Sequence, residues 1–239
     1  MTEFFRFPHT PHLAWLGEGE PRDDKLLDRS EVEALLADEV LVEEKLDGAN
    51  LGISWGDEGQ LRVQNRGAYL EAPYRGQFSR LNQWLMQHLA VCQQHLPDHV
   101  ILFGEWCAAR HSLDYAALPD WFMVFDVFDR QAQRFWNQER RNALSSRLGL
   151  AVAPLLERGR FTLKDLEGLV HTGRSAYRDG KLEGLVIRQD GPQWCEHRAK
   201  LVHPDFVQSI GEHWRSRALE WNELADRKSQ YIEKGEDRE

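Results

Sequence analysis

The chain has 239 residues, 41% hydrophobic and 29% charged, which excludes a disordered chain and a fibrous repeat. Its net charge of −9 argues against a protein that is held on nucleic acid by charge alone, although residues 1–60 alone carry 5 basic and 15 acidic side chains and the remainder is close to neutral. It has no segment with the ~20 apolar residues of a membrane span, and its 3 cysteines form no CxxC pair. We therefore expect a cytoplasmic protein without disulfide bonds.

Hydrophobic spacing and turn residues predict two helices and four strands in the first half of the chain. A short helix over 29–38 is expected to begin with a capping box formed by Ser30 and Glu33. A long amphipathic helix is expected over 77–96, where apolar residues recur on one stripe. Apolar runs predict strands at 40–44, 50–55, 61–65 and 100–106.

The second half is predicted to continue this mixture of strands and helices. We expect strands at 121–128, 184–189 and 193–202, and helices at 137–148 and 162–171. After residue 203 the apolar spacing predicts a helical extension over 204–239, on a stripe of Ile210, Trp214, Ala218, Trp221 and Leu224. With no internal repeat, the pattern favours an α+β fold with largely antiparallel sheets, in which 1–203 form one domain.

The most informative segment is EEKLDGAN at 43–50, in which Lys45 ends a strand and Gly48 makes a turn. A protonated lysine is a poor nucleophile, but burial or nearby cations lower its pKa. The neutral amine can then attack a nucleoside triphosphate and form a lysine–nucleotide phosphoramidate. On these residues alone, an ordinary surface hairpin is an equally good interpretation.

Further charged side chains stand at the ends of other predicted strands. Arg66 follows the strand at 61–65, Glu105 lies near the end of 100–106, and Glu183 comes directly before 184–189. Arg198 and Lys200 share one face of their strand because side chains alternate with a period of two. Phosphoryl transfer needs such cations aimed at the phosphate oxygens, whereas carboxylates need a sugar hydroxyl or a metal ion in between.

This ordered set of residues resembles the covalent nucleotidyltransferase superfamily of ligases and capping enzymes. More narrowly, it resembles the ATP-dependent RNA ligase family, on the branch of phage RNA ligase 2. The resemblance implies an ATP-grasp-like ligase core with a nucleotide pocket flanked by its sheets, ATP as the AMP donor, and Mg²⁺ or Mn²⁺. It also implies that AMP passes through a lysyl-AMP intermediate to the 5′-phosphate of an RNA end, to which a 3′-OH is then joined, in nicked duplex RNA and in RNA repair.

The resemblance assigns a role to each of the quoted residues. It implies catalytic roles for Lys45, Lys200 and Glu183, and it makes Glu183 the metal-binding carboxylate. It implies a nucleotide-binding set of Glu44, Asp47, Gly48, Arg66, Glu105, Phe125, Arg198 and Lys200. RNA contacts fall to Arg66 and Asn50; DNA ligases and capping enzymes usually carry arginine at the position of Asn50, which favours the RNA branch.

Several residues keep a structural alternative. Phe125 fits either an adenine stack or a plain core aromatic, because it lies in an apolar run. Arg198 stands where the family often has lysine, and it can bind phosphate but cannot lose a proton. The segment 109–115 also resembles the family, without an identifiable chemical role, and 7–13 fits an N-terminal strap near the nucleotide.

The short stretch after the last motif indicates no OB domain and leaves the grip on RNA unexplained. Ligation of DNA or hybrid nicks, capping of RNA with GMP, and a non-catalytic sensor of nucleotides or RNA ends remain the alternative functions. We expect a monomer that does not bind membranes, with a kinase or phosphatase as a partner that prepares RNA ends.

Overall fold

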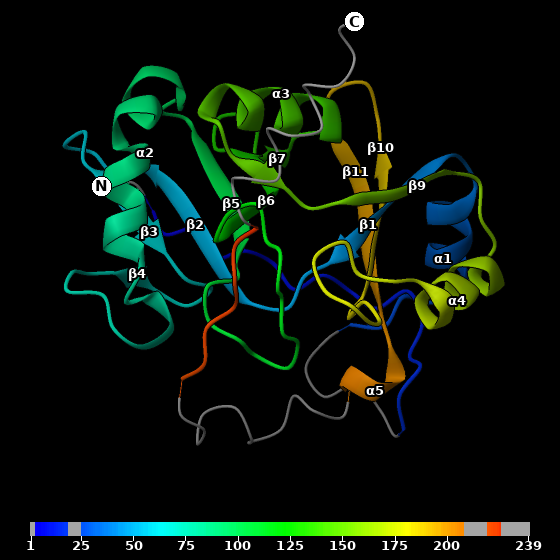
Figure 1. The fold of residues 1–239 in the computed structure, drawn as a ribbon. Helices are drawn as coiled ribbons and strands as arrows, with labels where there is room; N and C mark the ends of the chain where they lie inside the picture. The colour runs from blue at the N-terminus through cyan, green and yellow to red at the C-terminus, as the bar shows by residue number, and fades with distance from the viewer. Residues whose placement is uncertain (1–2, 19–24, 208–218, 226–239) are drawn as a thin grey trace, which may run out of the picture.

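The structure, a computed structural model, describes residues 3–18, 25–207 and 219–225. Two β-sheets stand side by side, with helices around them (Figure 1). Sheet A has the strand order β11-β10-β1-β9, and sheet B has the order β4-β3-β2-β5-β6-β7, with β8 added beside β6. Among the described strands, only β8 pairs with its neighbour in parallel. The prediction of an α+β fold with largely antiparallel sheets is confirmed.

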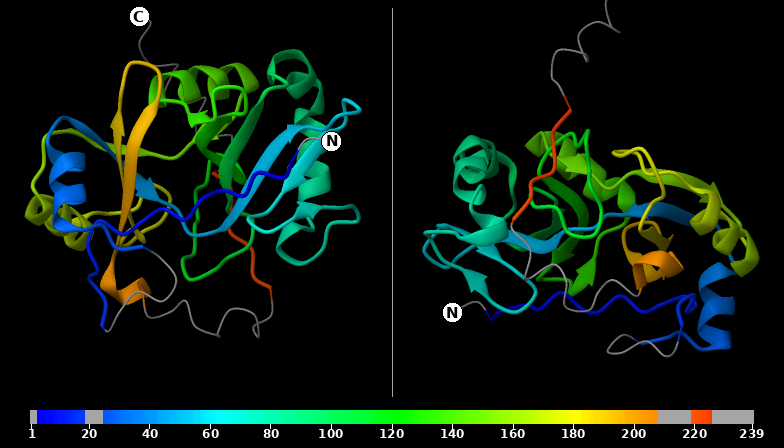
Figure 2. Two further views of the ribbon diagram at one scale, coloured as in Figure 1. Left: turned by 180° about the vertical axis from the view of Figure 1, so that it is seen from behind. Right: turned by 60° about the horizontal axis from the view of Figure 1, so that its bottom comes forward.

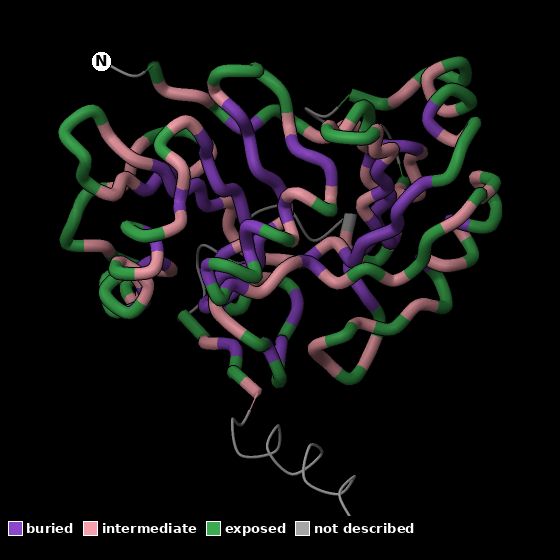
Figure 3. Tube along the Cα trace, turned by 90° about the horizontal axis from the view of Figure 1, so that it is seen from above, coloured by how far each residue is buried: buried purple, intermediate pink, exposed green. Residues whose placement is uncertain are grey.

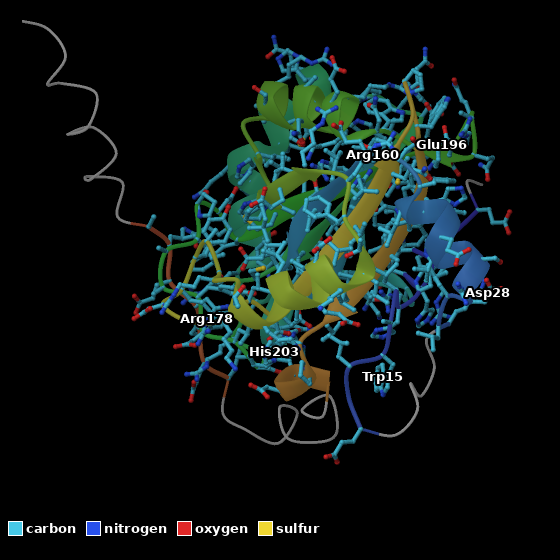
Figure 4. All side chains as sticks on the ribbon, turned by 90° about the vertical axis from the view of Figure 1, so that its right-hand side faces the viewer. Trp15, Asp28, Arg160, Arg178, Glu196 and His203 are labelled. Atoms are coloured by element: carbon cyan, nitrogen blue, oxygen red, sulfur yellow. The ribbon has the colours of Figure 1, made fainter. Side chains whose placement is uncertain are left out.

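The two faces of sheet A differ: one is apolar and the other is charged. Its strands are β1 (Val40–Lys45), β9 (Leu155–Gly159), β10 (Gly184–Asp190) and β11 (Cys195–Val202). The apolar face, which includes Val42, Leu185 and Leu201, packs against α1 (Arg29–Leu36) and α4 (Leu163–Thr172). Figure 4 views the sheet from the side of these two helices. The charged face therefore turns away from the helices, toward sheet B.

The cap of α1 differs from the sequence prediction. Asp28, not Ser30, is the N-cap, and it forms the capping box with Glu31. Ser30 instead donates its hydroxyl hydrogen to the Asp28 carboxylate at 2.7 Å. Two overlapping capping patterns thus compete here, and the aspartate, whose charge also suits a helix N-terminus, takes the position.

Sheet B forms one side of the main hydrophobic core. Its strands are β2 (Ala49–Trp55), β3 (Leu61–Gln64), β4 (Tyr69–Leu70), β5 (Val100–Trp106), β6 (Phe122–Asp129), β7 (Arg134–Phe135) and β8 (Ala151–Val152). One face packs against α2 (Leu81–His95) and α3 (Gln138–Leu148), and the 3₁₀ turn η1 (Gly76–Phe78) precedes α2. The central strands are buried while the surrounding loops are exposed (Figure 3).

Two buried ion pairs join the sheets. Arg141 on α3 donates to Glu43 on β1 at 2.6 Å, and neither side chain is more than 2% exposed. Arg188 on β10 donates to Asp126 on β6 at 2.6 Å. Both arginines also donate to the carbonyl of Phe125. Because a buried charge that loses its partner is costly, these pairs fix how sheet A sits against sheet B.

The segment after Lys45 is not a hairpin, although the sequence allowed one. β1 pairs with β10 and β9 in sheet A, whereas β2 pairs with β3 and β5 in sheet B. The Asp47–Gly48 turn therefore carries the chain from one sheet to the other. The surface-hairpin interpretation is wrong, and Lys45 lies where the two sheets meet.

The predicted C-terminal helix is only partly found. A short helix, α5, covers Pro204–Val207, and residues 219–225 are extended, with isolated bridges at Trp221 and Leu224. The helical prediction is wrong for 219–225, because this segment takes its hydrogen-bond partners from another loop. The rest of the predicted stripe, from Ile210 to Ala218, lies outside the described residues.

No helix in the described part of the chain combines the length and the apolar character needed to cross a bilayer. The three cysteines are free, as expected.

Candidate active site

The centre of the site is an ion pair between Lys45 and Glu183. Lys45 is the last residue of β1, and its partner in the register is Gly184, the first residue of β10. Glu183 directly precedes that strand, so its carboxylate reaches the lysine, with Nζ 2.8 Å from Oε1 and 2.7 Å from Oε2. The Lys45 side chain is 25% exposed and that of Glu183 is 9% exposed. The amine is thus held within the molecule and does not point into bulk solvent.

The electrostatics of Lys45 correct the sequence prediction. Burial alone lowers the pKa of Lys45, but the negative charges of Glu183, Glu105 and Asp47 outweigh it and raise that pKa above its ordinary value. Burial raises the pKa of Glu183 to about 8. We expected an uncharged amine among cations, and the structure instead places Lys45 beside acidic side chains that favour its protonated form. A proton must therefore leave Lys45 before it can act as a nucleophile.

The turn that follows Lys45 is fixed by main-chain contacts. Asp47 accepts hydrogen bonds from the backbone N–H groups of Ser112 and Leu113 at 2.7 and 2.8 Å, and its own N–H donates to the Tyr115 hydroxyl at 2.8 Å. The Gly48 N–H donates to Glu105 at 3.0 Å. The predicted residues Lys45, Asp47, Gly48 and Glu105 are thereby brought together.

Gly48 has no room for a side chain. A Cβ atom at this position would lie 2.6 Å from the Trp106 carbonyl oxygen and 3.1 Å from the Glu105 Cγ. Since the nearest obstacle is backbone within a central strand, it cannot move aside cheaply. Glycine at position 48 is required for the close passage of the turn over β5.

Burial raises the pKa of Glu105 to about 7, against the lowering effect of Lys45. Its register partner in β2 is Asn50. In the described residues, the buried Oδ1 of Asn50 and the buried Nε of Arg66 have no hydrogen-bond partner. Unpaired buried polar atoms are costly, so these two are suited to a polar ligand.

The register places the predicted cations on the face of sheet A that carries Lys45. Lys200 lies opposite Val186, which lies opposite Glu43, and residues directly opposite share a face. Lys45 is two residues beyond Glu43 and therefore shares this face too. Arg198 is two residues before Lys200, so the prediction that both cations share a face is confirmed. The three positive side chains thus belong to one surface.

Residues 3–13 form an N-terminal strap that crosses from sheet B to sheet A. The strap lies on the back of the molecule as drawn in Figure 1 and is seen in front in the left view of Figure 2. The Lys200 N–H donates to the Pro11 carbonyl, and the Leu13 N–H donates to the Lys200 carbonyl, both at 2.8 Å. The Phe7 ring contacts the Phe125 ring edge-on at 5.2 Å between centroids. The strap therefore holds the backbone of Lys200 and covers Phe125.

Phe125 sits at an irregularity in β6. The register between β5 and β6 shifts there, so that Asp126 faces Phe103 while Val124 faces Gly104, and Phe125 is the extra residue. Such a bulge re-aims a side chain. Phe125 is half-buried among aromatic rings, whereas its neighbours in β6 are buried. Both interpretations from sequence, an adenine stack and a core aromatic, fit this position.

Arg198 is held by partners within the protein. It forms an ion pair with Asp126, and its guanidinium lies 4.0 Å from the Phe135 ring centroid and 4.7 Å from that of Phe7. Its charge therefore lies beside the aromatic rings that surround Phe125.

Glu44 does not fit its expected role in nucleotide binding. Its register partner Leu185 belongs to the apolar face of sheet A, opposite to the face of Lys45. The Glu44 carboxylate is 1% exposed and accepts a hydrogen bond from the Ala176 N–H at 2.8 Å. Because adjacent residues in a strand point to opposite faces, its side chain turns away from the site.

The loop after β5 has a structural role that the sequence did not predict. The segment 109–115 had no assigned role, yet it supplies the three groups that hold Asp47. Two of these are backbone N–H groups, which any residue provides, so no side-chain pattern could reveal them. The Tyr115 hydroxyl is the one contact with a sequence signal.

A divalent cation would find few ligands from the protein itself. In the described parts of the chain, no group of three or more histidine, cysteine, aspartate or glutamate side chains could hold a metal ion. Glu183 is buried and Glu105 is half-buried, and both carboxyl groups act on Lys45. This set suits a cation such as Mg²⁺ that takes one or two carboxylates and completes its shell with phosphate oxygens and water.

Residues 38–202 match the family model described as RNA ligase. No curated protein matches the chain. Two solved structures of Naegleria gruberi RNA ligase with ATP and manganese are similar to this chain at 16% identity. The first has a TM-score of 0.62 and covers 89% of this chain and 66% of the Naegleria chain. The second has a TM-score of 0.58 and covers 75% of this chain and 54% of the Naegleria chain. An archaeal ATP-dependent RNA ligase is similar at 23% identity and a TM-score of 0.51, over 69% and 42%. The chain thus spans about two thirds or less of these structures, and the likeness concerns the fold.

Proposed function

The chain belongs to the RNA ligase family, and on that premise we propose that it is an ATP-dependent RNA ligase that forms a lysyl-AMP intermediate on Lys45. The observation that carries the proposal is the Lys45–Glu183 pair at the junction of the sheets, with the Gly48 turn and Glu105 beside it. Lys45 lies on the same face of sheet A as Arg198 and Lys200. This combination of a nucleophile, cations and carboxylates suits phosphoryl transfer.

In the first step, Nζ of Lys45 attacks the α-phosphorus of ATP. The N–P bond forms, the bond from the α-phosphorus to the bridging oxygen breaks, and pyrophosphate leaves. Glu183 is the group placed to take the proton, because its oxygen lies 2.7 Å from Nζ and burial raises its pKa to about 8. Lys200 and Arg198 stabilise the charge on the phosphate oxygens.

The remaining nucleotide contacts are divided between the two sheets. Glu105 and Asp47 are suited to the ribose side, Phe125 to the adenine ring and Arg66 to phosphate. While it carries no proton, Glu183 would hold the metal ion together with phosphate oxygens, and Mg²⁺ or Mn²⁺ there would supply positive charge that neutralises the phosphates. Glu44 is left out of this set, because its carboxylate lies on the opposite face.

RNA enters after the lysyl-AMP has formed. A 5′-phosphate oxygen attacks the phosphorus of AMP, the N–P bond breaks, and Lys45 regains its proton. A 3′-OH then attacks the activated phosphate and AMP leaves. Asn50 and Arg66 carry unpaired polar atoms suited to the RNA end. We propose that 1–203 form the adenylyltransferase domain and that the substrate is nicked duplex RNA in a repair reaction, with a monomeric enzyme and a kinase or phosphatase that prepares the ends.

Intact-protein mass spectrometry after incubation with ATP and Mg²⁺ tests the first step. The parent protein gains one AMP, and Lys45→Ala gains none. Lys164→Ala, which removes an exposed lysine from α4, is the matched control and is labelled like the parent. Labelling of Lys45→Ala would overturn the mechanism.

Three further measurements separate the alternative functions. Labelling by GTP in place of ATP would indicate a capping enzyme. ATP binding without pyrophosphate release would indicate a sensor. Sealing of a nicked duplex whose nick lies in RNA, but not of the same duplex in DNA, supports the RNA substrate, and the reverse preference contradicts it.

A further inference from the structure

Residues 219–225, here called the C-terminal segment, are built into the loop between β5 and β6. The Arg110 N–H donates to the Glu220 carbonyl at 2.9 Å, and the Ala225 N–H donates to the Leu118 carbonyl at 2.8 Å. Isolated β-bridges form between the same stretches. Figures 1 and 2 show the segment, in orange-red, running beside the green loop. The loop 107–118 thus has a main-chain partner along most of its length.

Asn222 is the centre of this contact. It is 4% exposed, and its side-chain amide donates to the carbonyls of Cys107 at 2.8 Å and Ala109 at 3.3 Å. Its Oδ1 accepts a hydrogen bond from the Tyr115 N–H at 2.9 Å. Only asparagine or glutamine combines donors and an acceptor in one uncharged group, and asparagine is the shorter. Asn222 therefore ties together the two ends of the loop.

The far side of the same loop holds the turn after Lys45. The Tyr115 hydroxyl accepts from the Asp47 N–H, and the Ser112 N–H donates to the Asp47 carboxylate. Tyr115 is only 2% exposed, so its ring and hydroxyl are fixed by packing. Contacts run without a gap from Asn222 to Tyr115 and from Tyr115 to Asp47, two residues beyond Lys45.

We propose that Asn222 is a positioning residue for the reaction at Lys45: it fixes loop 107–118, and through Tyr115 it sets the turn that orients the nucleophile. The proposal rests on the proposed function of Lys45. It places residues 219–225 in the catalytic unit, although they lie outside the range 38–202 that the RNA ligase family model matches.

The alternative is a purely structural Asn222, which would affect stability and nothing else. Two readouts separate the cases: the rate of AMP transfer to Lys45 at saturating ATP, set against the KM for ATP, and amide hydrogen exchange of peptides that contain Asp47 and Ser112. A local loss of position slows the transfer and releases these amides. A structural residue lowers the melting temperature and leaves both unchanged in the folded protein.

Asn222→Ala is expected to slow AMP transfer by about 10- to 100-fold, with a much smaller change in the KM for ATP. Exchange speeds up at Asp47, Ser112 and Leu113 but not in β10. The matched control is Glu220→Ala, which removes only the ion pair of Glu220 with Arg110, where both side chains are at least 42% exposed. This control is expected to behave like the parent.

Tyr115→Phe tests the same link without touching the segment, because it removes only the hydroxyl that accepts from Asp47. It should slow AMP transfer as well, and the double variant should be no worse than the worse single variant, since both break one chain of contacts. An unchanged rate and unchanged exchange at Asp47 in Asn222→Ala would overturn the proposal. If Asn222→Ala does not fold, an unchanged rate in Tyr115→Phe overturns it.

The exchange measurement needs no nucleotide, so it remains decisive if the parent protein takes up no AMP. In that case the proposed function fails, whereas selective release of the Asp47 amide still supports the positioning role of Asn222. Uniform exchange throughout the molecule would contradict it.

Discussion

The two sheets hold their parts of the site by different means. On the side of sheet A, ion pairs hold the site: Lys45 is paired with Glu183, and Arg198 is paired with Asp126. On the side of sheet B, the backbone holds the site: the Gly48 N–H donates to Glu105, and two loop N–H groups donate to Asp47. The first arrangement responds to protonation, and the second responds to chain geometry.

This difference indicates how the work is divided. A group that must gain and lose a proton benefits from a partner of matching acidity, and only the sheet A side provides one to Lys45. A turn that must pass close to a strand benefits from backbone N–H donors, whose positions are set by the path of the chain. Substitutions on the two sides should therefore change the rate of AMP transfer in different ways, through its pH dependence on the side of sheet A and through displacement of the turn on the side of sheet B.

Gly48→Ala should have the largest effect. The new Cβ would lie 2.6 Å from the Trp106 carbonyl oxygen, so the turn must shift away from β5 and take Lys45 with it. We expect AMP transfer to fall by at least about 100-fold, with no shift in its pH profile. A time course by intact mass spectrometry measures the rate.

The control is Gly168→Ala, on α4, where an added Cβ meets nothing within 4 Å. Alanine is the better helix former, so this variant should keep full activity and be slightly more stable. Full activity in Gly48→Ala would show that the turn tolerates displacement, and the contrast between the two sheets would lose its basis on the side of sheet B.

Glu183→Gln should act through the protonation of Lys45. Without the charge of Glu183, burial is opposed only by the weaker effects of Glu105 and Asp47, so the pKa of Lys45 falls. The amine then loses its proton at a lower pH, and the rise of the AMP-transfer rate with pH should move to lower pH. The maximal rate should fall roughly 100-fold, because the proton acceptor is gone.

The measurement is the single-turnover rate of AMP transfer across a pH series. Glu157→Gln, at an exposed position in β9 of the same sheet, serves as the control and should keep the parent profile. A profile that stays in place or moves to higher pH in Glu183→Gln would show that Glu183 does not govern the proton on Lys45.

Glu105→Gln should have a smaller effect, seen in stability. Burial raises the pKa of this carboxyl from 4.5 to about 7, so the folded protein binds the proton more tightly than the unfolded chain does. The free energy of unfolding therefore falls as the pH rises from 4.5 to about 7. The amide cannot ionise, and its oxygen still accepts from the Gly48 N–H, so the variant escapes this loss.

We expect Glu105→Gln to match the parent near pH 4.5 and to be more stable above pH 7 by about 1–3 kcal/mol. Urea unfolding followed by tryptophan fluorescence across this range tests it. Glu58→Gln, in the exposed turn after β2, is the control and should parallel the parent. A variant that is less stable than the parent above pH 7 would mean that the ionised carboxylate stabilises the fold.

The sequence was sufficient to locate most elements, because they follow local rules. β5 begins and ends where the apolar run predicted, and α3 and α4 begin one residue after the predicted starts at 137 and 162, where Asn137 and Thr162 are the N-caps. The faces of β11 also followed from alternation, which placed Arg198 and Lys200 together. Each of these features depends on residues that lie close together in the sequence.

What the sequence could not give is which distant segments meet. The Asp47–Gly48 turn has the composition of a hairpin, and only the pairing of β1 with β10 shows that it joins two sheets. Apolar spacing through Trp221 and Leu224 suits a helix, but the hydrogen bonds of this segment go to loop 107–118. The place of Lys45 at the end of a strand was predicted, but its electrostatics were not, because the raised pKa depends on carboxylates brought in by other strands.

Arg198→Lys should have the smallest effect, and it measures how far the sheet A side depends on charge alone. Lysine keeps the positive charge beside Asp126 but lacks the planar group that lies 4.0 Å from the Phe135 ring centroid. If charge is what matters, AMP transfer should fall only about two- to fivefold, the scale of a lost cation–π contact. Arg158→Lys, at an exposed site on β9, should leave the rate unchanged. A loss near that of Gly48→Ala would mean that the geometry of the guanidinium matters as much here as backbone geometry does in sheet B.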